Sequence, residues 1–237
     1  MKKHLFFALP LAAGMVLAGC GSAPKTQGEA KPVSETSKSP AAPKRSINYE
    51  ITDWQGASLG REIPVWVGDA TDRNKTALVT KIAELKDKEV YIHRDEAGDL
   101  DLIRANTQIN AFAQISTQIK AAISTGAGNV LSGNKGGSTD TAAKTQFVET
   151  TAAVVSKNVV SGFTLDRDFW QKRKYFDGKE TVEYLAVFAI RAEDLKHQMD
   201  LALGKIEAKT AAEREAKEAI RSAIRDAKTL LVEVTDQ

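Results

Sequence analysis

The stretch that decides the fold is FTLDRDFWQKRKYFDGKETVEYLAVFAIR, from Phe163 to Arg191. Asp177-Gly178 stands between two runs rich in β-branched and aromatic residues, and in that setting an Asp-Gly pair predicts a β-hairpin. Alternate residues of the second run, from Val182 to Ile190, are apolar and share one face of the predicted strand. Leu185 and Val187 lie on the opposite face, which indicates that this face is partly covered as well.

Upstream of the hairpin, residues 102 to 124 predict an amphipathic helix. Apolar residues recur there at spacings of three, four and seven, at Leu102, Ala105, Ile109, Phe112, Ile119 and Ile123, with Ile115 on the flank. Residues 125 to 141 are rich in glycine and small polar side chains and predict a loop. A second helix is expected from about 143 to 160, and the β-rich run Glu89 to His93 predicts a further strand.

Downstream, a helix is expected to begin near Ala192 and to pause at Gly204. Residues 205 to 231 are rich in Ala, Glu, Lys and Arg and predict a continuing helix. Packing of this helix on its own domain is favoured over a coiled coil, because its mostly alanine stripe keeps no strict heptad. The order of elements predicts an α+β fold: a small antiparallel sheet with a β-hairpin, helices packed on one face, and a long C-terminal helix. We expect one domain over residues 47–237.

The N-terminus predicts an export signal over residues 1–19. Lys2 and Lys3 precede an apolar run from Leu5 to Val16, which is shorter than the ~20 residues that a membrane-spanning helix needs. Leu17-Ala18-Gly19-Cys20 resembles the lipobox of bacterial lipoproteins. That resemblance implies cleavage before Cys20, which would then carry an S-diacylglyceryl group and an N-acyl chain such as palmitate. The alternative is an ordinary signal peptide with an accidental cysteine, but Cys20 is the single cysteine of the chain.

Residues 20–46 predict a lipidated cysteine followed by a flexible tether. Four of the six prolines lie here, and Val33 is the only large aliphatic residue. Such a segment buries too little apolar surface to offset its ordering entropy. We expect the tether to let the domain stand off a membrane and reach a partner.

Charge excludes one class of partner. The chain has 33 basic and 31 acidic residues. Removal of residues 1–19 takes away Lys2 and Lys3 and no acidic residue, so the mature chain has formal charge zero. Nucleic-acid binding requires a basic face and is not expected.

Three sequence patterns are candidates for functional sites. Gly128 and Gly133 have the spacing of a phosphate-binding loop, but Asn134 stands where that motif needs lysine. His93 and His197 are far apart and have no second ligand nearby, so a metal site is not expected. No cofactor is expected either.

The third pattern is the acidic pair Asp166 and Asp168. At positions i and i+2 of a strand these carboxylates are expected to share a face, where they could serve a hydrolase. Arg167 and the run Lys172 to Lys174 favour solvated, mutually compensated charge instead. We therefore predict no catalytic, cofactor-binding or metal-binding residues, and lipidation at Cys20 as the one modified site.

Over roughly residues 60–200 the chain resembles a family of small outer-membrane lipoproteins, the twenty-kilodalton lipoproteins and the FlgP-like flagellar disk and assembly lipoproteins. The resemblance rests on short apolar motifs: Ile63 to Val67, Glu89 to His93, Leu102 to Ala105, Val154 to Val160, the strand with Trp170, and Glu183 to Phe188. Three segments depart from the family pattern. They are the stretch of about twenty residues between Val67 and the next predicted strand, the segment 125–141, and the charged C-terminal helix.

The family implies no catalysis. The resulting hypothesis is a non-enzymatic structural or assembly protein of the cell envelope that contacts the membrane through its lipid and binds itself or another envelope protein. A flagellar association is implied by the resemblance alone. Gly21 after the cysteine favours the outer membrane by the usual sorting pattern, and we expect the domain to face the periplasm. The alternative is an accessory or regulatory lipoprotein of a cell-wall enzyme complex. No small-molecule substrate is predicted.

Overall fold

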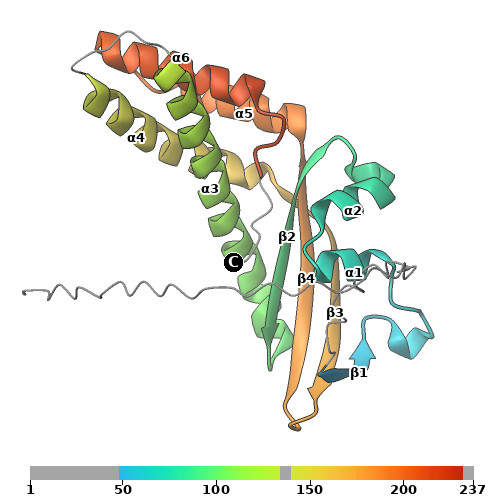
Figure 1. Ribbon diagram of the computed structural model, residues 1–237. Helices are drawn as coiled ribbons and strands as arrows, with labels where there is room; N and C mark the ends of the chain where they lie inside the picture. Colours follow the sequence, from blue (N-terminus) through green and yellow to red (C-terminus); the bar gives the residue numbers. More distant parts are fainter. Residues whose placement is uncertain (1–47, 134–139, 232–237) are drawn as a thin grey trace, which may run out of the picture. The chain divides into compact units, whose positions relative to one another are not determined.

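The computed structural model describes residues 48–133 and 140–231. The chain divides into two units, Met1–Arg45 and Ser46–Gln237, and all described elements belong to the second. Cys20, the expected signal peptide and the whole of the expected tether lie outside the described residues. The second unit has the predicted α+β fold (Figure 1).

A four-stranded antiparallel sheet forms its centre. The strands are β1 (Tyr49–Trp54), β2 (Lys88–Ala97), β3 (Thr164–Tyr175) and β4 (Glu180–Arg191), in the order β1-β3-β4-β2. The predicted hairpin is confirmed as β3 and β4. Its turn needs glycine, because Gly178 has φ +87°, a region that side-chain-bearing residues avoid. β1 was not predicted, since it is only six residues long and the adjacent polar residues Thr52 and Asp53 interrupt the alternation that would indicate a strand.

Four helices form a bundle on one side of the sheet: α3 (Leu100–Gly133), α4 (Thr141–Val159), α5 (Ala192–Gly204) and α6 (Ala211–Asp226). α3 and α5 contact β2 and β4, and α4 and α6 pack on α3 and α5. The main core lies beneath them and includes Ile115 and Ile119 of α3, Val155 of α4, and Tyr184 and Phe188 of β4. The second half of α3 runs past the end of the sheet and packs with α4 and α6 (Figure 1).

The opposite face carries two short helices, α1 (Trp66–Thr71) and α2 (Lys75–Lys81). With the 3-10 turn Ala83–Leu85 they bury a second core around Leu78, Leu85 and Phe169, closed by Leu185 and Val187 of β4. The expectation that Leu185 and Val187 are covered is confirmed. The helices therefore lie on both faces of the sheet rather than on one, because β4 is apolar on both sides.

α3 is longer than predicted, and the predicted loop 125–141 was wrong over its first half. The helix continues to Gly133. The small residues here allow close packing: a Cβ at Gly126 would lie 2.8 Å from the Cβ of Ala223 on α6. The glycines of this segment predict a break in the helix, whereas Gly126 in the structure lets α6 approach α3 closely.

The buried stripe of α3 also differs from the prediction in its first half. Every fourth residue is buried, at Ile103, Thr107, Ala111, Ile115, Ile119, Ile123 and Ala127. Four residues turn a 3.6-residue helix through about 400°, so this stripe moves about 40° per step around the helix. The stripe turns because the first half of α3 packs on the sheet, whereas its second half packs on α4 and α6 (Figure 1). Leu102 and Ile109, predicted in the stripe, are 59% and 69% exposed.

The C-terminal helix is shorter than the predicted 205–231. α6 begins at a capping box, in which the Thr210 side chain accepts from Glu213 N and the Glu213 carboxylate accepts from Thr210 N. It ends at Asp226, where Lys196 Nζ donates to the carbonyls of Arg225 and Ala227 at 3.0 and 2.6 Å. The chain then runs to the start of β2, where Leu230 and Leu231 are buried in the main core.

Candidate functional site

The glycine pattern is not a phosphate-binding loop in this structure. Gly128 and Gly133 both lie within α3, where helical backbone groups are already bonded to one another. Asn134 lies outside the described residues. The spacing that matched half of the motif is thus produced by small residues in a packed helix.

The two histidines lie in different surroundings. His93 is in the middle of β2, 4% exposed, and its Nε2 has no hydrogen-bond partner in the structure. Burial lowers the pKa of His93, and Asp95 opposes this while Arg73 adds to it. His197 is exposed on α5. Over residues 48–133 and 140–231, no three His, Cys, Asp or Glu side chains are grouped so that they could hold a metal ion.

Asp166 and Asp168 do not form a paired site. A bulge between Leu165 and Arg167 breaks the two-residue alternation of β3, so the expectation of a shared face was wrong. Asp166 accepts from Lys88 Nζ at 2.9 Å and Arg167 Nε at 2.8 Å, whereas Asp168 accepts from Tyr184 Oη at 2.7 Å. Burial opposes ionisation of Asp166, but these two cations hold its pKa below the ordinary value.

The structure contains a buried charge cluster, on the α1–α2 face of β3 and β4, that was not predicted from the sequence. Glu183 is fully buried, and its Oε2 accepts from Gln171 Nε2 at 2.6 Å and from Arg173 Nη2. Arg94 Nε lies 2.7 Å from Oε1, as an ion pair without hydrogen-bond alignment. Arg173 is 1% exposed and lies over the ring of Tyr49, with 4.1 Å between Cζ and the ring centroid. The prediction that Lys172, Arg173 and Lys174 are solvated was therefore wrong for Arg173.

Glu96 extends this cluster at its edge. Its Oε1 accepts from Tyr175 Oη at 2.5 Å and Thr181 Oγ1 at 2.6 Å, and its Oε2 lies 3.5 Å from Arg173 Nη1. Burial opposes ionisation, but the two hydrogen bonds and the nearby guanidinium groups lower the pKa of Glu96. Two arginines balance two glutamates, so the cluster has no spare acid or base to offer a substrate. Its geometry fixes the pairing of β1, β3, β4 and β2.

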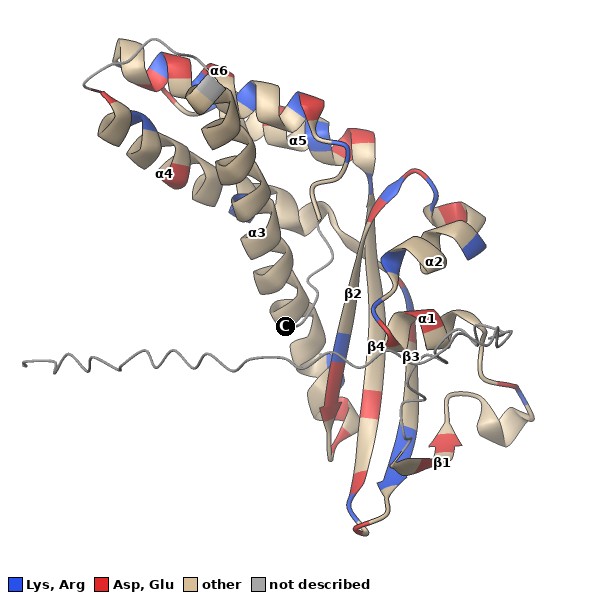
Figure 2. Cartoon of the chain, in the orientation of Figure 1, with Lys and Arg blue, Asp and Glu red and all other residues tan. Residues whose placement is uncertain are grey.

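A different feature is open to solvent: the outer face of the first half of α3. Leu102, Ala105, Ile109 and Ala113 are exposed and lie on one side of the helix. The helix carries only Asp101, Arg104 and Lys120 as charged residues in its 34 positions. Figure 2 shows α3 almost entirely without charge along its length. We call Leu102, Ala105, Ile109 and Ala113 the α3 apolar face.

Beside the α3 apolar face, a groove of about 500 Å³ lies between α3 and the start of β3. Phe112 and Phe188 meet edge to face in it, with 5.7 Å between ring centroids. Leu165 is exposed at its rim. Arg104 lies 5.7 Å from the ring centroid of Tyr184, whose pKa burial and the hydrogen bond to Asp168 raise. The groove is lined by Arg104, Thr107, Gln108, Phe112, Ser161, Phe163, Thr164, Leu165, Tyr184 and Phe188.

Contiguous exposed apolar surface marks sites of contact with proteins, membranes or ligands. The sequence pattern could not separate this face from the core, because its leucine and isoleucine fit the same spacing as the buried residues. In the described ranges, no helix has the length and hydropathy needed to cross a bilayer. Comparison with protein-family models, with curated proteins and with solved structures gives no match.

Proposed function

We propose that this chain is a lipid-anchored protein of the cell envelope that acts without catalysis, by binding another copy of itself or an envelope protein. The lipobox-like Leu17-Ala18-Gly19-Cys20 supports the anchor. We propose that the lipid lies in the outer membrane and that the domain faces the periplasm. In its finer form, the proposal is a role in an envelope assembly, which includes the flagellar assemblies of the family that the sequence resembles.

The observation that carries the proposal is the α3 apolar face with its groove. Two large aliphatic side chains, Leu102 and Ile109, are more than half exposed one above the other on a helix with few charges. Exposed side chains of this kind add nothing to the core. Burial of these side chains against a partner would contribute a favourable free energy of about 25 cal/mol for each Å² of apolar surface removed from water.

The test compares two double variants of the full mature chain in detergent micelles. Leu102→Lys with Ile109→Lys puts two cations on the α3 apolar face. Leu59→Lys with Phe176→Lys adds the same charge at two exposed apolar positions elsewhere, which are 71% and 79% exposed. Both should fold, because none of the four side chains belongs to a core cluster.

Affinity purification from crosslinked envelopes and mass photometry of the purified chain provide the readout. We expect the wild type and the Leu59/Phe176 variant to give the same oligomers or co-purified proteins, and the Leu102/Ile109 variant to lose them. Equal complexes in all three chains would contradict a role for the α3 apolar face.

A further inference from the structure

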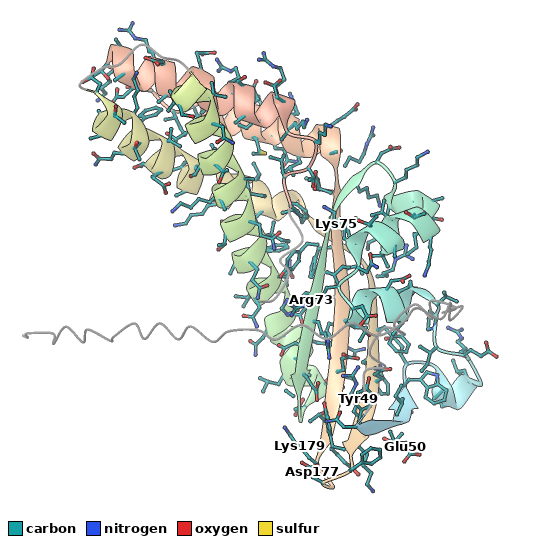
Figure 3. The ribbon with its side chains drawn as sticks, in the orientation of Figure 1. Tyr49, Glu50, Arg73, Lys75, Asp177 and Lys179 are labelled. Carbon is teal, nitrogen blue, oxygen red and sulfur yellow. The ribbon has the colours of Figure 1, made fainter. Side chains whose placement is uncertain are left out.

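A cavity of about 860 Å³ lies at the end of the sheet where β2 begins and β4 ends. Five cations from four segments line it: Lys75 of α2, Lys86 and Lys88 before and at the start of β2, Arg191 at the end of β4, and Lys228 after α6. Three acidic residues also line the cavity: Asp87, Glu89 and Glu193. Figure 3 places Lys75 near this end of the sheet and Tyr49 near the other.

The cations of the cavity are not equally compensated. Lys75 Nζ lies 3.3 Å from Glu89, Lys88 Nζ 2.9 Å from Asp166, and Arg191 Nη2 3.8 Å from Glu193. Lys86 and Lys228 make no ion pair within the part of the chain that the structure describes. Asp87 is the one acidic lining residue likewise without an ion pair there. Lys86 and Lys228 are therefore the two cations of the cavity lining that no carboxylate of the described residues balances through an ion pair.

The segment from Lys228 to Leu231 forms one wall of the cavity, and it is held by Glu89. The buried Glu89 carboxylate accepts from Leu230 N at 3.0 Å and from Thr229 Oγ1 at 3.0 Å. Lys75 Nζ, the ion-pair partner of Glu89, also donates to the Leu231 carbonyl at 2.9 Å. The ion pair between the half-buried Lys75 and the buried Glu89 thus fastens the segment that carries Lys228.

We propose that this cavity binds a small molecule bearing a phosphate group. Its volume lies in the usual range of ligand pockets, about 300–1,000 Å³. Lysines bind phosphate as point charges, and a phosphate monoester carries about 1.5 to 2 negative charges at neutral pH, which suits Lys86 and Lys228. Glu89 and Lys75 hold residues 229–231 at the start of β2, which places Lys228 in the cavity lining.

The test is a titration of the full mature chain, in uncharged detergent micelles, with inorganic phosphate at constant ionic strength set by chloride. Line broadening of the phosphorus-31 NMR signal measures binding. Lys86→Glu with Lys228→Glu reverses both uncompensated charges. Lys179→Glu with Lys205→Glu makes the same change in net charge at two exposed lysines outside the cavity.

We expect saturable binding to the wild type and to the Lys179/Lys205 variant, and binding weaker by at least about tenfold in the Lys86/Lys228 variant. In chains reconstituted into phosphatidylcholine vesicles, added phosphatidylglycerol should compete with phosphate if the source is a lipid headgroup, and should have no effect if it is a soluble phosphate compound. Linear, unsaturable broadening, or equal affinity in the two lysine double variants, would overturn the proposal.

Discussion

Arg173 and Glu183 show at the scale of single residues how charge is used inside this sheet. Both side chains are almost completely buried on neighbouring strands, where each serves as the other's counter-charge. A buried ion pair repays its desolvation only when its geometry and its further hydrogen bonds are good. Here Gln171, Arg94 and Glu96 supply those additional contacts.

The first prediction concerns this pair. Glu183→Gln should lower the free energy of unfolding by about 3–5 kcal/mol, because it leaves Arg173 buried with too little counter-charge. Arg173→Met combined with Glu183→Leu should recover much of that loss. Urea denaturation measures both. The exposed pair Lys174–Glu180 on the same hairpin is the control: Glu180→Gln should change stability by less than about 1 kcal/mol. Similar losses for Glu183→Gln and Glu180→Gln would show that the buried pair has no special weight.

The second prediction concerns His93. Its folded-state pKa lies below the ordinary value because it is buried, so the unfolded chain takes up a proton more readily. Stability is then present above the ordinary histidine pKa of about 6.5 and is lost as pH falls through the folded-state value. Urea denaturation at about pH 7.5 and 5.5 should show this fall in the wild type and in His197→Leu, but a smaller fall in His93→Leu. An unchanged pH dependence in His93→Leu would assign the effect to other groups.

At the scale of elements, α3 separates what periodicity can predict from what it cannot. The third prediction uses two isoleucines of this helix. Ile115 is fully buried and Ile109 is 69% exposed. Ile115→Ala should cost about 2–5 kcal/mol, and Ile109→Ala less than about 0.5 kcal/mol. Denaturant titration of the two variants decides between the observed stripe and the one that sequence spacing predicts, in which Ile109 is buried and Ile115 lies on the flank.

The hairpin, β2 and the helices α4 and α5 could be predicted from the sequence, because each has one strong local signal. Asp177-Gly178 sets the turn, and Gly204 ends α5. The buried stripe of α3 could not be predicted, because the buried face turns where the helix stops packing on the sheet and begins to pack on α4 and α6. Only the tertiary arrangement specifies where that change occurs.

The charge cluster was missed for a related reason. Lys172, Arg173 and Lys174 look alike in the sequence, yet only Arg173 points into the α1–α2 face. Its partner Glu183 lies ten residues away on the other strand. Strand alternation and the register about the Asp177-Gly178 turn would together have indicated this pair. The expected same-face pairing of Asp166 and Asp168 failed because a bulge leaves no clear local signal.

At the scale of the whole molecule, we propose an N-terminal lipid anchor and a domain that exposes the α3 apolar face. The fourth prediction concerns the anchor. Cys20→Ser should move the protein from the membrane pellet to the soluble fraction, or leave an uncleaved precursor, because acyl chains give the stable attachment. Cell fractionation and intact-mass spectrometry measure this, with Ser22→Ala as the control. An acylated, pelleted Cys20→Ser protein would refute lipidation at this residue.

The most direct test of the central claim, that the α3 apolar face binds a protein partner, is site-specific photocrosslinking in intact cells. A photoreactive amino acid replaces Ile109 in one chain and Phe176 in another; both positions are exposed, and Phe176 lies at the hairpin turn away from the α3 apolar face. The account predicts discrete crosslinked species, either a dimer of this chain or an adduct with an envelope protein, from position 109 and not from position 176. No adduct from position 109, or the same adducts from both positions, would contradict it.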